Sequence, residues 1–409
     1  NNQRIWSVAV VPLSPGGERT RFEQLVLLNG QVHVVSSLSN AYEKTVYSQQ
    51  LDAHGNYLPA IHILGATTPD AAVAVTINQG RMLLILQQQA EPQQTSVALF
   101  QGSYQPAWSV LLPVKGNIQD VVLTASGNAF ILTASPPTNS PEAAFYLYRF
   151  EGRNGRNTMQ PIGNTALRPL QARMAALHGD VIVAGLTAPA PFVASLSPEP
   201  TGTFYYRFPK GRFRNSVQHY APIDSVFLQN YKAYKPDLDH SQRLRYLQLQ
   251  HLLPLAGKQV AMLGEVYTSD KKIHHTDDIL IVAFDENGRT HFTTSINKHQ
   301  SGPVNEVRLG SYIASVAQDT LRLIYLDFEY NYNAQQQLST ANSGTASKTP
   351  VLVTIDPAGR QKVRPLLQAQ TGQSQDFHLV PAAAYQTGAG EFIVLGAGKG
   401  YYKFGHLKF

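Results

Sequence analysis

The chain has 409 residues, of which 43% are hydrophobic and 15% are charged, so it carries enough apolar material for a large core and is not a disordered protein. Its net charge is +6, but the basic residues are scattered and do not form the continuous basic stretch with interleaved aromatic residues that is typical of nucleic-acid binding. The absence of cysteine excludes disulfides, thiolate metal sites and cysteine nucleophiles, and no stretch approaches the roughly 20 apolar residues of a membrane helix. We therefore expect neither a nucleic-acid partner nor a transmembrane segment.

Pairs of short apolar strands flanking a tight turn recur seven times along the chain. They span residues 25–35, 73–86, 121–132, 174–185, 252–265, 312–326 and 382–396. Most carry glycine at the turn, which tolerates the positive φ that two-residue hairpin turns demand. The first four turn glycines, at Gly30, Gly80, Gly127 and Gly179, are 50, 47 and 52 residues apart. A four-stranded propeller blade occupies roughly 40–50 residues, so this spacing predicts one blade per repeat, and the longer later intervals predict insertions.

A second hairpin follows the first in most repeats. Three of its turns share an Asp-x-x-Gly pattern, at residues 52–55, 285–288 and 356–359. Aspartate at the first turn position accepts backbone N–H bonds and glycine supplies the left-handed exit, so the pattern predicts tight turns. A calcium loop would need further acidic positions that these segments lack.

The two ends of the chain predict a closed ring. Only one strand, residues 401–409, follows the last apolar hairpin, and the segment 4–13 repeats the Trp-Ser-Val run found at Trp108 in residues 107–114. We expect residues 4–13 to complete the blade formed by 382–409, which would remove exposed sheet edges. The sequence thus predicts an all-β protein of one domain, residues 1–409, folded as a seven-bladed β-propeller of four-stranded blades.

Two segments interrupt the regular pattern. Residues 210–252 read as an irregular insertion, with an extended piece at 225–235 and a stretch at 243–253 in which alternation favours strand and leucine content favours helix. Residues 333–349 read as a polar loop.

Two groups of polar residues invite a metal-site interpretation, and both are better explained without one. Asp327 and Glu329 alternate with aromatic residues and could offer oxygen ligands to Ca²⁺, but one strand face supplies few of them, so a solvated strand end is favoured. The run His274-His275-x-Asp277-Asp278 holds two histidines and two carboxylates, but adjacent histidines on a strand face opposite ways. We expect that run at an exposed hairpin tip.

The sequence carries no recognisable catalytic signature. It lacks a Gly-x-Ser-x-Gly elbow, a phosphate-binding loop and a His-Glu-x-x-His motif, so we assign no catalytic residue and no cofactor. Glycoside hydrolysis needs only two carboxylates across a cleft, for which Glu265, Asp224 and Asp327 are candidates, and this possibility stays open.

A further pattern occupies about a quarter of the chain, in residues 296–302, in 310–331 and in the ending GKGYYKFGHLKF. A Lys-x-Gln element precedes a strand pair that ends in an Asp and Asn tract, and the residues concerned are Lys298, Gln300, Asp327 and Asn331. In this pattern the chain resembles a group of uncharacterised secreted or envelope-associated proteins of the Bacteroidota. The resemblance implies an exported propeller-like protein and brings no activity with it.

The start at Asn1, without methionine, agrees with export to the periplasm, the outer membrane or the medium. The functional expectation is a non-enzymatic binding or scaffold protein that recognises a protein or a glycan through rim loops and the 210–252 insertion. The expected contact residues are Lys210, Arg212, Arg214, Tyr231 and Tyr234. The alternative is a polysaccharide-active enzyme, a glycoside hydrolase or lyase, with carboxylates at the mouth of the central channel.

Overall fold

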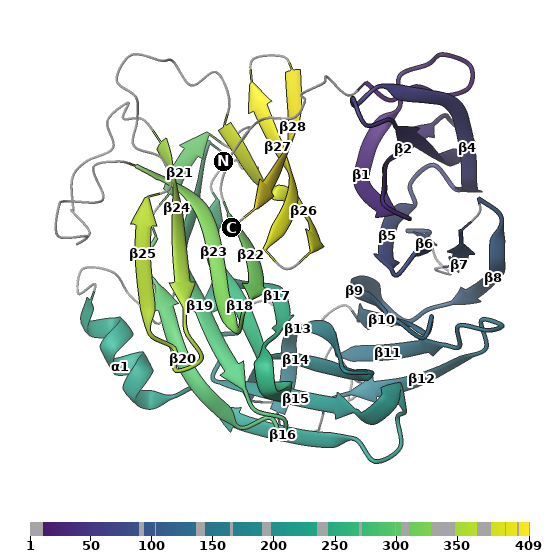
Figure 1. The fold of residues 1–409 in the computed structure, drawn as a ribbon. Helices are drawn as coiled ribbons and strands as arrows, with labels where there is room; N and C mark the ends of the chain where they lie inside the picture. The colour runs from purple at the N-terminus through teal and green to yellow at the C-terminus, as the bar shows by residue number, and fades with distance from the viewer. Residues whose placement is uncertain are drawn as a thin grey trace, which may run out of the picture. The chain divides into compact units, whose positions relative to one another are not determined.

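The protein is all-β, as a computed structural model shows (Figure 1). The structure describes residues 11–89, 94–102, 104–135, 144–163, 167–189, 198–234, 244–269, 272–298, 300–303, 311–328, 348–365, 378–388, 390–398 and 401–408. The chain divides into two compact units, one spanning Val10–Tyr220 and the other containing Ala221–Phe409.

Four antiparallel sheets of four consecutive strands each make up the Val10–Tyr220 unit. Their strands are β1 (Arg21–Leu28), β2 (Gln31–Ser39), β3 (Lys44–Leu51) and β4 (Tyr57–Thr67); β5 (Ala72–Asn78), β6 (Arg81–Gln87), β7 (Gln94–Gln101) and β8 (Pro106–Pro113); β9 (Asn117–Leu123), β10 (Ala129–Ala134), β11 (Phe145–Phe150) and β12 (Asn157–Ile162); and β13 (Leu167–Leu177), β14 (Asp180–Pro189), β15 (Gly202–Phe208) and β16 (Val217–Pro222). A short 3₁₀ turn, Pro209–Gly211, separates β15 from β16.

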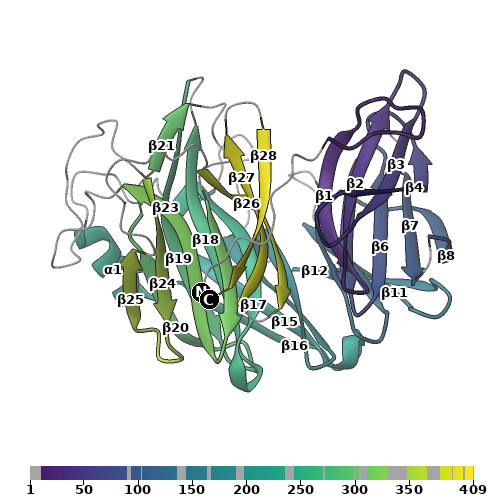
Figure 2. The same cartoon turned by 45° about the horizontal axis from the view of Figure 1, so that its top comes forward.

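Three further sheets and an α-helix belong to the second unit. Helix α1 (Ser225–Tyr234) comes first, followed by β17 (Leu247–Pro254), β18 (Val260–Ser269), β19 (Ile273–Phe284), β20 (Thr290–Ile296) and β21 (Gln300–Pro303); β22 (Tyr312–Ala317), β23 (Thr320–Phe328), β24 (Lys348–Ile355) and β25 (Gln361–Pro365); and β26 (His378–Gly388), β27 (Glu391–Gly398) and β28 (Tyr401–Lys408), with a 3₁₀ turn at Ala256–Lys258. Figures 1 and 2 show α1 beside β20, which it contacts.

The turns form for the reasons that their residues dictate. Asn29 and Gly30 between β1 and β2 both have positive φ, 52° and 77°, as a two-residue hairpin turn requires. In the turn after β3, Asp52 accepts backbone N–H bonds from His54 and Asn56 at 2.8 Å, and Gly55 takes a φ of 85°. The turns at 285–288 and 356–359 repeat this arrangement, so the predicted turn chemistry is confirmed.

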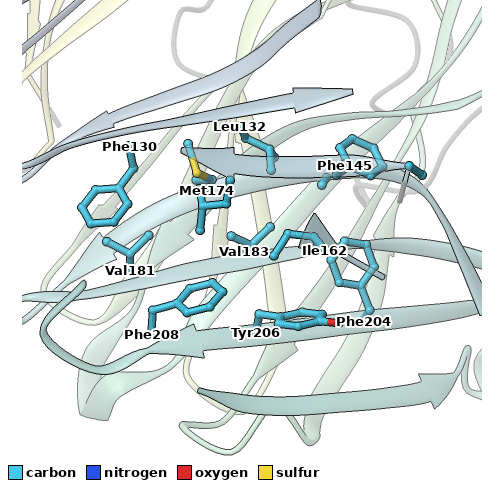
Figure 3. Close-up of a cluster of buried hydrophobic side chains, with 13 residues drawn as sticks. Phe130, Leu132, Phe145, Ile162, Met174, Val181, Val183, Phe204, Tyr206 and Phe208 are labelled. Carbon is cyan, nitrogen blue, oxygen red and sulfur yellow. The ribbon is translucent and has the colours of Figure 1, made fainter. Parts of the chain in front are cut away.

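The hydrophobic core lies between successive sheets. One cluster joins the third and fourth sheets, where Phe130 and Phe145 meet Met174, Val183 and Phe204 (Figure 3). Similar clusters join the first sheet to the second and the second to the third, and, in the other unit, the fifth to the sixth and the sixth to the seventh. Within each unit the first strands of successive sheets also touch one another. Buried on both faces, the strands therefore read as nearly continuous apolar runs.

The sequence predictions for the fold hold in part. The all-β class is confirmed, and the described chain forms seven consecutive antiparallel sheets. Ring closure through residues 4–13 is not tested, because residues 1–10 lie outside the described part. The seventh sheet has three strands there.

The 210–252 segment differs from the prediction. Its extended-looking piece is helix α1, and the stretch left open between strand and helix forms strand β17 from Leu247 onward. Asp224 initiates α1, because its Oδ1 accepts the backbone N–H of Val226 at 2.8 Å and of Phe227 at 3.3 Å. Most of the predicted 333–349 loop lies outside the described residues. No helix in the described ranges is long and apolar enough to cross a membrane.

Candidate functional site

A β-bulge in the fifth sheet turns two aspartates toward the interior. Across β18 and β19, Glu265 pairs with Ile279 and Tyr267 pairs with Thr276, so Asp277 and Asp278 stand opposite the single residue Val266. A bulge of this kind re-aims side chains and is common beside active sites. Both aspartates are buried, at 7% and 3% exposure.

The same point of β19 is where its second partner strand changes. Ile279 pairs with Ile296 at the end of β20, whereas Thr276 pairs with Gln300 at the start of β21. Lys298 lies in the connection between β20 and β21 and therefore arrives directly beside the bulge. The local backbone irregularity of two neighbouring segments thus brings a lysine to the two aspartates.

Lys298 is the most deeply buried charged residue of the group, with 0% exposure. Its Nζ donates to Glu265 Oε1 at 2.5 Å and to the Thr276 carbonyl oxygen at 3.0 Å, and its backbone N–H donates to Asp278 Oδ1 at 3.3 Å. Burial lowers the pKa of Lys298, and the carboxyl groups of Glu265, Asp277 and Asp327 oppose that shift.

Glu265 is held on both of its oxygens. Lys298 occupies Oε1, and Gln250 Nε2 donates to Oε2 at 2.9 Å. Gln250 reaches Glu265 because it is the extra residue of a bulge in β17, between Leu249 and His251. The Ser311 hydroxyl in turn donates to Gln250 Oε1 at 3.2 Å, which orients the amide.

Asp278 is reached from outside its sheet by an aromatic residue. The Tyr231 hydroxyl, carried by α1, donates to Asp278 Oδ2 at 2.7 Å. Tyr231 is half-buried and its ring stacks on that of Phe227 one turn earlier, with centroids 5.7 Å apart and planes 16° from parallel. A phenol on a carboxylate and a stacked aromatic pair thus cover this side of the cluster.

The neighbouring sheet contributes Asp327 at the end of β23, which is 1% exposed. Gln300 links the two sheets, because it accepts a hydrogen bond from the Thr276 hydroxyl at 2.8 Å and donates one to the Leu326 carbonyl oxygen. Four buried carboxyl groups therefore lie around Lys298: Glu265, Asp277 and Asp327 act on its ammonium group, and Asp278 accepts its backbone N–H. We call these five residues the carboxyl cluster.

Three other sheets show what the fold itself requires at this place. Their first strands contain the same one-residue bulge, and the second-strand residue that corresponds to Glu265 can be read from the register. That residue is Ser37 in the first sheet, Ala134 in the third and Ala188 in the fourth. The bulge is therefore compatible with a small neutral side chain at this position, and among these four sheets a buried charge at this position is particular to the fifth.

The structure unites some of the residues nominated from the sequence. Glu265 and Asp327, two of the three candidate carboxylates, lie together, whereas Asp224 is exposed and caps α1. The positions Lys298, Gln300 and Asp327, marked by the resemblance, also come together, and Asn331 lies outside the described residues.

The interpretation of His274-His275-x-Asp277-Asp278 as an exposed hairpin tip is wrong. The run lies in β19, where pairing with β18 and β21 buries His274, Asp277 and Asp278. The alternation of polar residues concealed a bulge, which depends on partner strands that a single segment does not reveal. Among the residues that the structure describes, no three His, Asp or Glu side chains are arranged to hold a metal ion, and Glu329 is outside them.

The expected contact residues do not form one described group. Lys210, Arg212 and Arg214 are exposed in the β15–β16 connection, where the Lys210 backbone N–H donates to Asp180. Tyr231 belongs to α1 in the other compact unit, and the Tyr234 side chain is not described.

Comparison with known proteins gives similarity in fold without close relatives. The sequence matches no protein-family model and no curated protein. Among solved structures, the polysaccharide lyase Uly1 covers 97% of this chain and 90% of its own, with a TM-score of 0.49 and 9% identity. The α-L-arabinofuranosidase Arb93A from Fusarium graminearum covers 100% and 97%, with a TM-score of 0.37 and 10% identity. The AfRom2 CNH domain covers 100% and 99%, with a TM-score of 0.43 and 9% identity.

These neighbours correct the functional expectation. Several of the similar structures are enzymes that cleave glycans, including an exo-β-1,3-galactanase and GH43 enzymes. The expectation of a non-enzymatic protein is overturned in favour of the alternative enzyme interpretation. At such low identity and TM-score the neighbours supply no residue roles, which must come from the carboxyl cluster itself.

Proposed function

We propose that this protein is a polysaccharide-active enzyme, specifically a glycoside hydrolase, whose site is the carboxyl cluster. The observation that carries the proposal is the contrast between Glu265 and its counterparts Ser37, Ala134 and Ala188. Burying ions costs several kcal/mol per ion even after relaxation, on the order of the whole stability margin of a domain. A fold that tolerates alanine there does not need the charge for its architecture, so we assign the charge to chemistry.

Glycoside hydrolysis matches the residue types present. It requires one carboxylic acid to protonate the leaving oxygen and one carboxylate to activate water or attack the sugar. Glu265 has both oxygens engaged by Lys298 and Gln250, so its role is to hold Lys298 in place. Asp278, whose Oδ2 is covered by a residue from α1, and Asp327 on the adjacent sheet are the carboxyl groups that we assign to the reaction.

The same electrostatics favour a neutral glycan over a uronate. A lyase that removes the proton beside a uronate carboxylate must neutralise that carboxylate with a cationic or amide group. In the described part of the cluster the cation is Lys298, which is buried and bonded to Glu265, and four carboxyl groups surround it. The carboxyl cluster would repel the carboxylate groups of a uronate substrate, so hydrolysis of a neutral glycan is the favoured reaction.

The test is reducing-end release from a panel of neutral polysaccharides, with the absorbance of unsaturated uronate products as the lyase readout. We expect Asp278→Asn and Asp327→Asn each to lower turnover at least a hundredfold, because each removes a group that moves a proton or bonds to the sugar. Asp120→Asn is the matched control, since Asp120 is a half-buried carboxyl group in the other unit that accepts the Met174 backbone N–H at 2.7 Å. Full activity in both variants, with the control equally active, would refute the assignment.

Two further properties belong to the same proposal. We place the seven sheets in one closed propeller ring, supported by their blade-like succession and by the core between consecutive sheets. Deletion of residues 1–13 should then lower the unfolding temperature markedly, and an unchanged melting curve would contradict closure.

We also place the enzyme outside the cytoplasm, on polysaccharide of the envelope or medium, which the presence or absence of a leader in the precursor decides.

A further inference from the structure

Helix α1 carries a feature that the proposed reaction does not use. The Tyr231 hydroxyl donates a hydrogen bond to Asp278 Oδ2 at 2.7 Å. The opposite oxygen, Oδ1, accepts the backbone N–H of Lys298 and is fixed within the sheet. The two hydrogen bonds thus differ in kind, because one is part of the sheet's irregular backbone and the other comes from a separate helix.

The helix depends on contacts with the rest of the unit. It has 10 residues, and isolated helices shorter than about 12–15 residues are marginal in water. Val226 on its first turn is 61% exposed, and Phe227 and Tyr231 are half-buried. The Tyr231–Asp278 hydrogen bond is one of the contacts that hold the helix on the sheet, together with the packing of α1 on β20.

The chemistry of the covering side chains fits a sugar ring. A pyranose presents apolar C–H faces and a hydroxyl edge, and an aromatic surface next to a hydrogen-bond acceptor accommodates both. The stacked rings of Phe227 and Tyr231 supply the aromatic surface, and Asp278 supplies the acceptor. A phenol hydroxyl and a sugar hydroxyl donate to a carboxylate in the same way, so exchanging one for the other costs little hydrogen-bond energy.

We infer that the Tyr231 hydroxyl occupies the position of a substrate hydroxyl on Asp278, and that a neutral glycan displaces it while the aromatic pair of α1 forms the adjacent sugar subsite. This inference rests on the proposed hydrolase function. It makes Tyr231 a specificity-determining residue that competes with the substrate. The competition predicts the sign of a mutational effect, because removal of a competitor tightens substrate binding.

The first measurement is the kinetics of Tyr231→Phe on the best substrate of the polysaccharide panel. We expect KM to fall about two- to tenfold, the range of one intramolecular hydrogen bond, with kcat within twofold of the parent. Tyr220→Phe is the matched control, since the Tyr220 hydroxyl bonds to that of Tyr206 at 2.7 Å in the other unit, and it should leave KM unchanged. A loss of kcat in Tyr231→Phe would make Tyr231 catalytic and overturn the inference, as would an unchanged or raised KM.

The second measurement separates this inference from the proposed function. Amide hydrogen exchange across residues 225–234 is followed in the parent chain with and without neutral oligosaccharides of the same panel. Displacement of Tyr231 predicts faster exchange in α1 when an oligosaccharide is bound. If no polysaccharide is cleaved, the hydrolase function fails, and this exchange response alone decides the inference. No exchange response to any oligosaccharide would overturn it.

Discussion

The fourth and fifth sheets solve one structural problem with opposite chemistry. Both carry a one-residue bulge in their first strand, with Leu170 as the extra residue in β13 and Gln250 in β17. Beside the bulge the fourth sheet places Ala188, and the fifth places Glu265 bonded to Gln250 and Lys298. The first sheet is intermediate, since Ser37 there donates to Glu23, its own extra residue, at 2.6 Å. The bulge therefore recurs with the fold, whereas the side chain placed beside it differs from sheet to sheet and can carry a charge.

The fourth and fifth sheets also differ in the interactions that stabilise them. The core between the third and fourth sheets consists mainly of apolar side chains, and its stability follows the area removed from water (Figure 3). In the fifth sheet the ion pair of Lys298 and Glu265 exchanges two hydrated charges for one short contact, which is at best weakly stabilising. The fourth sheet is therefore expected to lose stability by losing volume, and the fifth by losing a partner.

The largest effect is expected from Lys298→Met. The substitution leaves Glu265 buried without its cation, which should destabilise the protein by about 3–5 kcal/mol. Denaturant unfolding measures the change. The double variant Lys298→Met with Glu265→Leu should recover part of it, because it removes the unpaired Glu265 charge but leaves Asp277 and Asp327 without the cation. Comparable losses in single and double variants would mean that packing, rather than charge pairing, governs the fifth sheet.

The double variant also bears on function. It recovers part of the stability but does not restore the Lys298 ammonium group, so glycan hydrolysis should stay low in the variant that is more stable than Lys298→Met. An active double variant would mean that the ion pair has no role in positioning the reacting groups.

A smaller effect is expected from Met174→Ala in the core between the third and fourth sheets. Met174 is 5% exposed and packs among Phe130, Val183 and Phe204 (Figure 3). Removal of its side chain should cost about 2–5 kcal/mol, toward the lower end if flexible neighbours fill the space. The replacement Met174→Leu conserves volume and should cost less than about 1.5 kcal/mol, measured by the same unfolding experiment. Equal losses for both would contradict a volume-governed core.

The repeating hairpins of this protein can be predicted from local sequence alone. Turn residues such as Gly30 and the aspartates at 52, 285 and 356 act through local backbone geometry, so their spacing revealed seven repeats. The apolar runs between them identified the strands. Local pattern failed at α1, where a sequence read as extended became a helix capped by Asp224. The cap is itself a local signal, and it was available in the sequence.

The carboxyl cluster, in contrast, forms through contacts between segments that are distant in the sequence. Glu265, Lys298 and Asp327 come from three segments of the chain. Asp277 and Asp278 turn inward because β19 bulges against β18 at the point where its other partner changes from β20 to β21. A bulge is a property of paired strands rather than of one strand, so the run 274–278 looked like an exposed tip when read alone. Burial of charge likewise depends on what surrounds it, and the same residues are unremarkable until distant strands enclose them.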